Sequence, residues 1–269
     1  MGKKKRYLIE TSAVRVAIGE TTPEHSRHFE EAISDGELST SIYIRMEFLR
    51  RWIRYYAQMA LRVDCFRNLS HAVNHESESF SARDLKTLLH LLSALSASGK
   101  EFGGREAAKE IVHIAVTTLY KFDSRFRSQA PNTCGCKTGG REFRPDFSKL
   151  FEDVRAFLRS WYVGEGCGIQ GFLNLGKPSR ASKLLELHQI RDDTSAGKAL
   201  AQLKHKSDTI TCKDCQKIGD IVIALEQQAA WCLVHIDSAF DILCAATGRN
   251  HKKIGSVRGV EGSRPEMAD

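Results

Sequence analysis

The sequence predicts an α/β fold with a mainly parallel central sheet and a largely helical middle. Segments 6–10, 37–41 and 231–236 have the length of short strands, and the first and last are apolar enough to be buried. Helical patterns separate these segments along the chain. Because parallel strands need helical crossovers, this order of elements favours parallel pairing.

Helix signals follow the first two strands. Proline is favoured in the first turn of a helix, so a helix is predicted from Pro23 to about Ser34, with Thr22 as a candidate cap. The turn at 35–36 ends this helix. A long helix is predicted from about Ile42, because apolar residues recur there at helical spacing. These apolar residues are Phe48, Trp52, Tyr55, Tyr56 and Met59.

The middle of the chain is predicted to be mainly helical. Residues 70–80 are polar and are expected to form a loop. Turn-rich stretches at 131–140 and 164–176 interrupt the helical patterns. The helices predicted in this part are 81–96, 104–120, 146–161, 180–190 and 195–206.

The C-terminal part returns to the sheet. A helix is predicted at 218–230, before the last strand, and a short helix at 238–246 after it. The tail 256–269 is polar and is predicted to be disordered. These elements predict a discontinuous core formed by residues 1–60 and 215–255, with 61–214 as a helical insertion.

The composition is that of a globular protein with basic character. Of 269 residues, 42% are apolar and 27% are charged, and the formal net charge is +7. Positive charge attracts phosphate backbones, although it can also serve solubility alone. No apolar run of about 18 residues predicts a membrane span, and the basic N-terminus lacks the apolar segment of a signal peptide. A cytoplasmic protein without a membrane partner is expected.

Four acidic residues carry the strongest functional signal. They are Glu10, Glu47, Asp220 and Asp237, each at a predicted strand end or near a helix start. Carboxylates at one edge of a parallel sheet repel one another unless divalent cations neutralise them. Because oxygen ligands suit Mg²⁺ or Mn²⁺, the pattern predicts metal-assisted phosphodiester cleavage. The alternative is that these residues are helix caps and surface charges.

The segments around these residues resemble, in the same order, the motifs of the PIN-domain nucleases, including the toxins of VapC type. The matching segments are Tyr7–Ser12, Leu38–Ser41 with Glu47, Gly219–Ala224 and Leu233–Phe240. The resemblance covers about 5–60 and 215–255 and implies a PIN-like three-layer fold with endoribonuclease activity. The implied ligands of one or two Mg²⁺ or Mn²⁺ ions are Glu10, Asp220, Asp237 and, directly or through water, Glu47.

The same resemblance implies partners. The substrate would be RNA, and family members often form homodimers and are often inhibited by an antitoxin protein. Thr11 or Ser12 would help to orient the scissile phosphate. A toxin–antitoxin role is therefore an expectation of the resemblance, and the residues themselves show neither partner.

Three positions raise separate questions. Glu10 stands where the family usually has Asp, and its longer side chain would move a metal by on the order of 1 Å, which can cost about 10²-fold in rate. His235 stands where a hydroxyl residue is common. It would either contact a phosphate or, as we prefer, fill a strand position. Asp241 is either an extra metal ligand or an exposed helix residue.

Cysteines form a second constellation. In a chain with no export signal, eight cysteines indicate thiols or metal ligands rather than disulfides. Two short-spaced pairs can each supply two corners of a structural zinc site, namely Cys134 with Cys136 and Cys212 with Cys215. Cys167 could replace one of these ligands, and a redox pair or unrelated thiols are the alternatives. The cysteines expected to be packed core thiols are Cys65, Cys232 and Cys244.

Basic residues alternate with aromatic residues in the long helix after Ile42. They could form a track for a nucleic-acid backbone or the solvated face of a helix whose aromatic residues are core. The residues concerned are Arg45, Arg50, Arg51 and Arg54, together with Lys3–Arg6.

The preferred hypothesis is a PIN-like, metal-dependent endoribonuclease with a zinc-stapled helical insertion. One alternative is a catalytically weak or inactive PIN-like scaffold that binds RNA or a protein partner. The other is a zinc-dependent interaction domain in which the acidic residues are incidental.

Overall fold

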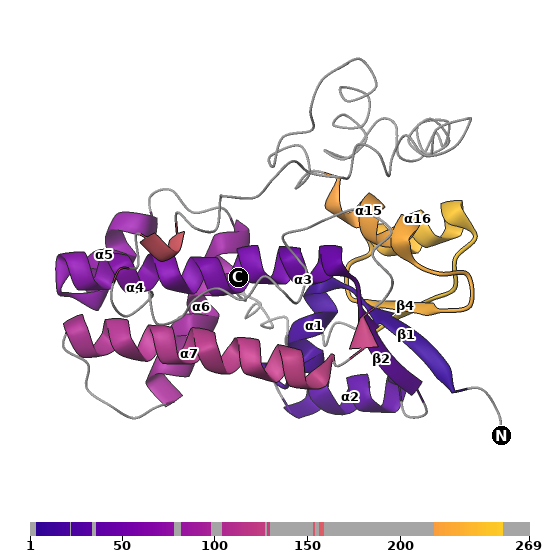
Figure 1. Cartoon of the computed structure of the whole chain (residues 1–269), viewed down its shortest axis with the longest axis horizontal. Helices are drawn as coiled ribbons and strands as arrows, with labels where there is room; N and C mark the ends of the chain where they lie inside the picture. The colour runs from indigo at the N-terminus through magenta and orange to yellow at the C-terminus, as the bar shows by residue number, and fades with distance from the viewer. Residues whose placement is uncertain are drawn as a thin grey trace, which may run out of the picture.

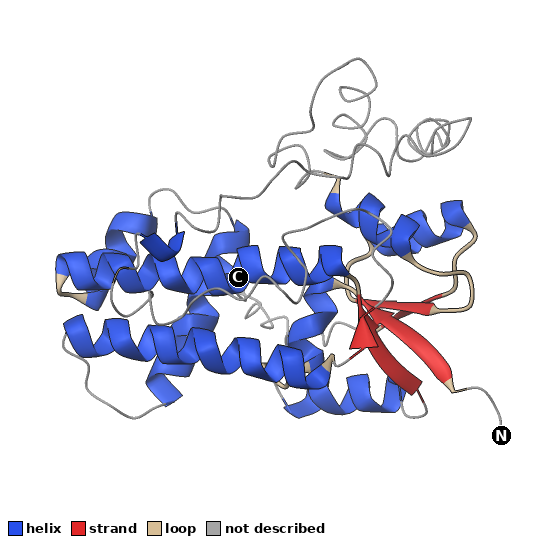
Figure 2. Ribbon diagram, viewed as in Figure 1, coloured by secondary structure: helices blue, strands red, loops and turns tan. Residues whose placement is uncertain are grey.

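The computed structural model describes residues 4–21, 23–33, 36–77, 82–97, 104–126, 128–129, 153, 156–158 and 218–254. Within these ranges the protein is helix-rich and has one sheet (Figure 2). The elements up to residue 77 are β1 (Lys5–Ile9), α1 (Thr11–Ala17), α2 (Pro23–Ile33), β2 (Gly36–Thr40), α3 (Ile42–Phe48), the π-helical turn η1 (Leu49–Ile53), α4 (Arg54–Phe66) and α5 (Leu69–Ser77). The later elements are α6 (Ala82–Ala97), α7 (Gly104–Arg125), β3 (Ser128–Gln129), α15 (Gly219–Glu226), β4 (Cys232–His235), α16 (Ala239–Thr247) and β5 (His251–Lys253).

The sheet has the strand order β3-β2-β1-β4-β5, and every neighbouring pair is parallel. Leu8 of the central strand pairs with Ser39 on one side and with Leu233 on the other. Leu8 is fully buried, as expected for a parallel strand with both faces covered. In Figure 1, α15 and α16 lie above the strands and α2 lies below them. The predicted α/β fold with a parallel sheet is confirmed.

The helices α3, η1 and α4 follow one another without a break and lead away from the sheet (Figure 1). The residues at both junctions keep right-handed helical backbone angles. The long helix α7 packs beside α4, and the rings of Phe48 and Phe122 stack with their centroids 4.5 Å apart. Trp52, Tyr56 and Met59 are buried, which confirms the core positions that helical spacing predicted.

Several elements differ from the prediction. Residues 70–80 were expected to form a loop, but α5 occupies Leu69–Ser77, and Asn68 caps it by accepting the His71 N–H at 3.1 Å. Helix α7 continues to Arg125, beyond its predicted end. The sequence patterns did not predict α1, β3 or β5. The predicted helices at 180–190 and 195–206, the tail 256–269 and most of 146–161 lie outside the described residues.

Two predictions about individual side chains were wrong. Cys65 was expected to be a core thiol but is exposed, whereas Cys244 is buried and Cys232 is half-buried. Arg45 was a candidate for a surface track, but it is fully buried and forms an ion pair with Asp123 at 3.4 Å. Of the aromatic residues beside the arginines, Trp52 and Tyr56 are core, as the alternative prediction held, and Tyr55 is partly buried against that core. No helix in the part of the chain that the structure describes has the length and apolar character to cross a membrane.

Candidate carboxylate site at the sheet edge

Glu10 follows β1 at the carboxyl end of the central strand, where its backbone N–H donates to the Val234 carbonyl at 3.0 Å. Its buried side chain caps helix α1. Oε1 accepts from the N–H groups of Ala13 (3.0 Å) and Ile236 (3.2 Å) and from the Ser12 hydroxyl. Oε2 accepts the Ser12 N–H at 2.7 Å. One carboxylate therefore joins the end of β1, the first turn of α1 and the end of β4.

Burial shifts the protonation of this carboxyl group. The pKa of Glu10 is raised from 4.5 to about 7, mainly by burial and to a smaller extent by the nearby Glu47 carboxylate, while the hydrogen bonds from Ser12 and Ile236 oppose the shift. Glu10 thus titrates near neutral pH. A cation beside it would favour the charged form.

Glu47 reaches the same region from helix α3. Its Oε2 accepts a hydrogen bond of 2.6 Å from the hydroxyl of Thr11, the buried residue that follows Glu10. The hydroxyl of Thr11 or of Ser12 was expected to help to orient a phosphate. In the structure each of them donates to a carboxylate instead.

Asp220 lies in the first turn of α15 and is half-buried. The residue before it, Gly219, packs against α3: a Cβ atom at Gly219 would lie 3.1 Å from the Tyr43 hydroxyl. Tyr43 and Glu47 are four residues apart in α3, so they lie on one face of that helix. The start of α15 therefore packs on the face of α3 that carries Glu47.

Asp237 lies two residues after β4 and is exposed. Its Oδ1 accepts the Ala239 N–H at 2.9 Å at the start of α16. The preceding residue, Ile236, donates its N–H to Glu10, which places the backbone before Asp237 next to the Glu10 carboxylate.

The four predicted ligands therefore lie on neighbouring elements, but they are not equally close to one another. Glu10 and Glu47 are coupled through their charges and through Thr11. Among the described residues, however, the four predicted carboxylates do not place three oxygen atoms within 4.8 Å of one another. Cys134, Cys136, Cys167, Cys212 and Cys215 lie outside the described residues.

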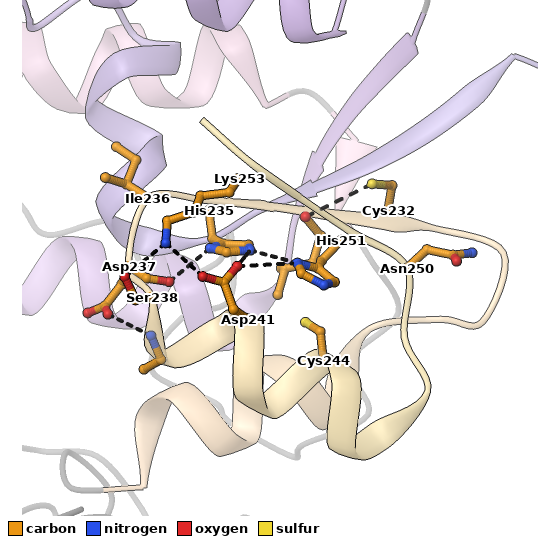
Figure 3. A network of polar contacts seen from close by, with 12 residues as sticks. Cys232, His235, Ile236, Asp237, Ser238, Asp241, Cys244, Asn250, His251 and Lys253 are labelled. Atoms are coloured by element: carbon orange, nitrogen blue, oxygen red, sulfur yellow. Dashed lines mark hydrogen bonds and ion pairs between the residues drawn. The ribbon is translucent and has the colours of Figure 1, made fainter. Parts of the chain in front are cut away.

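A different group of residues does place its ligand atoms within 4.8 Å of one another. It consists of His235, Asp241 and His251 (Figure 3). His235 Nε2 lies 3.0 Å from His251 Nδ1 and 3.5 Å from Asp241 Oδ1, and the latter two atoms are 3.7 Å apart. Burial lowers the pKa of His235, and the hydrogen bond from Lys253 lowers the pKa of Asp241. Both directions favour a neutral imidazole and a charged carboxylate.

The sequence pattern indicated two members of this group, His235 and Asp241, but not His251. His235 fills a buried strand position, as preferred, while Asp241 is a partly exposed helix residue. His251 belongs to β5, a strand that only its pairing with β4 defines. No short spacing motif links these three positions, so the sequence offered no direct signal for the group.

Comparisons with known proteins give no relative to guide the interpretation. No protein-family model matches the chain, and neither a curated protein nor a solved structure matches it.

Proposed function

We propose that the protein is a PIN-like endoribonuclease that uses Mg²⁺ or Mn²⁺ at the carboxylate edge of its sheet. The observation that supports this most strongly is the position of Glu10. Its carboxyl group is buried at the carboxyl end of the central strand, coupled to Glu47 and hydrogen-bonded to the backbone before Asp237. The carboxyl ends of parallel strands are where open α/β sheets usually bind ligands.

The donor atoms at this edge suit a hard divalent cation. Glu10 Oε1 already accepts three hydrogen bonds, whereas Oε2 accepts one and keeps a lone pair for an ion. The residues that would hold the ions are Glu10, Glu47, Asp220 and Asp237. Bound there, the ions would activate water and stabilise the leaving oxygen of a phosphodiester.

Three of the four carboxylates are held in place by hydrogen bonds from neighbouring residues. Thr11 orients Glu47 through its hydroxyl, Ser12 and Ile236 fix the Glu10 carboxylate, and Ala239 fixes Asp237. These contacts hold the carboxylates before substrate arrives, which reduces the reorganisation needed during reaction.

The choice of RNA and of biological partners rests on the motif resemblance and on the net charge of +7. The proposal includes an antitoxin or other protein partner, homodimer formation, a cytoplasmic location and a structural zinc ion. Arg6 contributes little near the ions, because it lies in the amino-terminal half of β1 and pairs with Glu37 at 3.2 Å. Arg45 is buried and is excluded from phosphate contact.

One observation favours a second candidate, a weak or inactive PIN-like scaffold that binds RNA or a protein. Four hydrogen bonds occupy Glu10, and its pKa of about 7 leaves it partly neutral at physiological pH. A Glu10→Asp variant separates the candidates. Increased cleavage would favour a live site with an overlong ligand, and an inert variant from an inert parent would favour the scaffold.

The primary test is cleavage of labelled single-stranded RNA with Mn²⁺, using the full chain, Asp220→Asn and Asp64→Asn. Asp64 is an exposed carboxylate of α4, at 3.9 Å from Arg105 and away from the sheet edge, and serves as the control for the same chemical change. The proposal predicts metal-dependent cleavage that Asp220→Asn abolishes and Asp64→Asn retains. Equal cleavage by all three proteins would contradict it.

A further inference from the structure

We propose that His235, Asp241 and His251 form a binding site for a divalent transition-metal ion of the zinc type, separate from the carboxylate edge. The three side chains come from β4, α16 and β5, respectively, and converge on one point (Figure 3). Two imidazole nitrogens and one carboxylate oxygen are borderline ligands, which suit zinc better than magnesium.

The separations between the three ligand atoms fit an ion at their centre. Zinc bonds of about 2.0–2.1 Å in tetrahedral geometry place neighbouring ligands about 3.3–3.4 Å apart. The observed separations are 3.0, 3.5 and 3.7 Å. Small shifts of the side chains, without movement of the strands, would therefore create a coordination site.

His235 is held in the orientation that a metal requires. Its side chain has no exposed surface, and Nδ1 lies 2.9 Å from the Asp237 carbonyl oxygen. A carbonyl can only accept, so Nδ1 carries the proton and Nε2 presents its lone pair to the centre of the group. A second hydrogen bond of this kind is the usual way in which proteins orient a metal-binding histidine.

One side of the group remains accessible to solvent. The side chains of His251 and Asp241 are 30% and 38% exposed. An ion could enter there and take a water molecule as its fourth ligand, as in sites with three protein ligands. His251 would then carry its proton on Nε2, leaving Nδ1 for the ion.

Lys253 supplies the rival explanation. Its Nζ lies 2.7 Å from Asp241 Oδ2, so the group could be an ion-pair network that needs no metal. The lysine contacts Oδ2, however, and leaves Oδ1 directed at the two histidines. The nearby positive charge would weaken metal binding without preventing it.

A bound ion would act on the sheet edge. It would tie the exposed edge strand β5 and helix α16 to β4. It would also strengthen the hydrogen bond from His235 to the Asp237 carbonyl, because a metal on Nε2 makes Nδ1–H a better donor. The stronger hydrogen bond would hold the segment that carries Asp237 more firmly in place. Only this last consequence depends on the proposed nuclease function.

The test is metal binding by the full chain, stripped with a chelator and then equilibrated with Zn²⁺. His251→Gln removes one ligand from a partly exposed position, and His113→Gln changes an exposed histidine of α7 as the matched control. The wild type and His113→Gln are expected to bind one more zinc ion per chain than His251→Gln. Equal zinc content in all three proteins would overturn the proposal.

Cobalt spectroscopy and a change at Lys253 test the same ligand assignment. Both proteins are loaded with Co²⁺, and the spectrum of His251→Gln is subtracted from that of the wild type. The difference should show visible bands without the near-ultraviolet absorption of thiolate ligands. Thiolate absorption in the difference would contradict the assignment. Lys253→Met should raise the zinc affinity at least severalfold, because it removes a positive charge beside Asp241. If His251→Gln does not fold, Asp241→Asn replaces it and must lose the same zinc ion.

Discussion

The hydroxyl of Thr11 donates to Glu47 Oε2 at 2.6 Å, and this bond joins the start of helix α1 to helix α3. Thr11 follows Glu10 directly, so the two acidic residues share one short polar connection at the sheet edge. A second threonine makes a hydrogen bond of the same length elsewhere: Thr118 of α7 donates to Glu20 Oε1, also at 2.6 Å. The pair gives a matched comparison between a bond at the candidate site and a structural bond.

Thr11→Val and Thr118→Val should each reduce the free energy of unfolding by about 2 kcal/mol, because each removes a hydrogen bond to a charged group. Only Thr11→Val should also reduce Mn²⁺-dependent RNA cleavage. Chemical denaturation measures the first effect, and a cleavage assay on the folded proteins measures the second. A similar loss of activity in both variants would show that Thr11 has no special relation to the site.

The stability of the metal-free protein should depend on pH through Glu10. Its folded pKa of about 7 exceeds the unfolded value of 4.5, so the folded state holds this proton more tightly. Protonation of Glu10 therefore contributes to the free energy of unfolding. This contribution is fully present below about pH 4.5 and is lost as the pH rises through about 7, and it amounts to at most about 3 kcal/mol.

Glu10→Gln removes this titration, so the difference in stability between the two proteins isolates it. Denaturation in the presence of a chelator at pH 5 and pH 8 should show the wild type losing more stability than the variant over this interval. Parallel pH profiles would contradict the raised pKa of Glu10.

Gln227 should be important for the edge of the sheet. Its buried amide donates to the Trp231 carbonyl at 2.8 Å and to the Asn250 carbonyl at 2.6 Å, which connects the end of α15 with the segments before β4 and β5. Gln227→Leu keeps a similar volume but removes both bonds. Thermal or chemical denaturation should show a loss of about 2 kcal/mol. An unchanged stability would contradict this role of the Gln227 amide.

The sequence predicted those parts of the fold that depend on local patterns. The apolar residues of β1 and β4 indicated buried strands, and the spacing of Phe48, Trp52 and Tyr56 indicated the helix that continues through η1. Helix α1 was missed because it begins with a glutamate cap, which is not a favoured cap residue, and contains β-branched valines.

Other features depend on contacts that no local pattern reveals. The three residues of β5 are all exposed, so no apolar alternation marks this strand, and only pairing with β4 forms it. The same pairing brings His251 to His235. Glu10, Asp220 and Asp237 could be named from the sequence because each lies at or beside the end of an element, whereas Glu47 lies inside α3 and was named from the motif order. Their burial and hydrogen bonds required the tertiary structure.

The predicted cysteine zinc site lies outside the described residues and has its own test. A Cys212→Ser and Cys215→Ser double variant should lose one zinc ion per chain, and the Co²⁺-loaded wild type should show thiolate absorption that this variant lacks. Cys65→Ser, a change at an exposed thiol, is the control. Unchanged zinc content in the double variant would favour unrelated thiols.

The central claim is that the carboxylate edge of the sheet binds a divalent metal ion. It is tested most directly by titrating the zinc-saturated full chain with Mn²⁺ and measuring the free ion by electron paramagnetic resonance. The wild type and Asp64→Asn should bind Mn²⁺, and Asp220→Asn should bind it on the order of ten- to a hundredfold more weakly. Equal Mn²⁺ affinity in the wild type and Asp220→Asn, with both proteins folded, would contradict a metal site at the carboxylate edge.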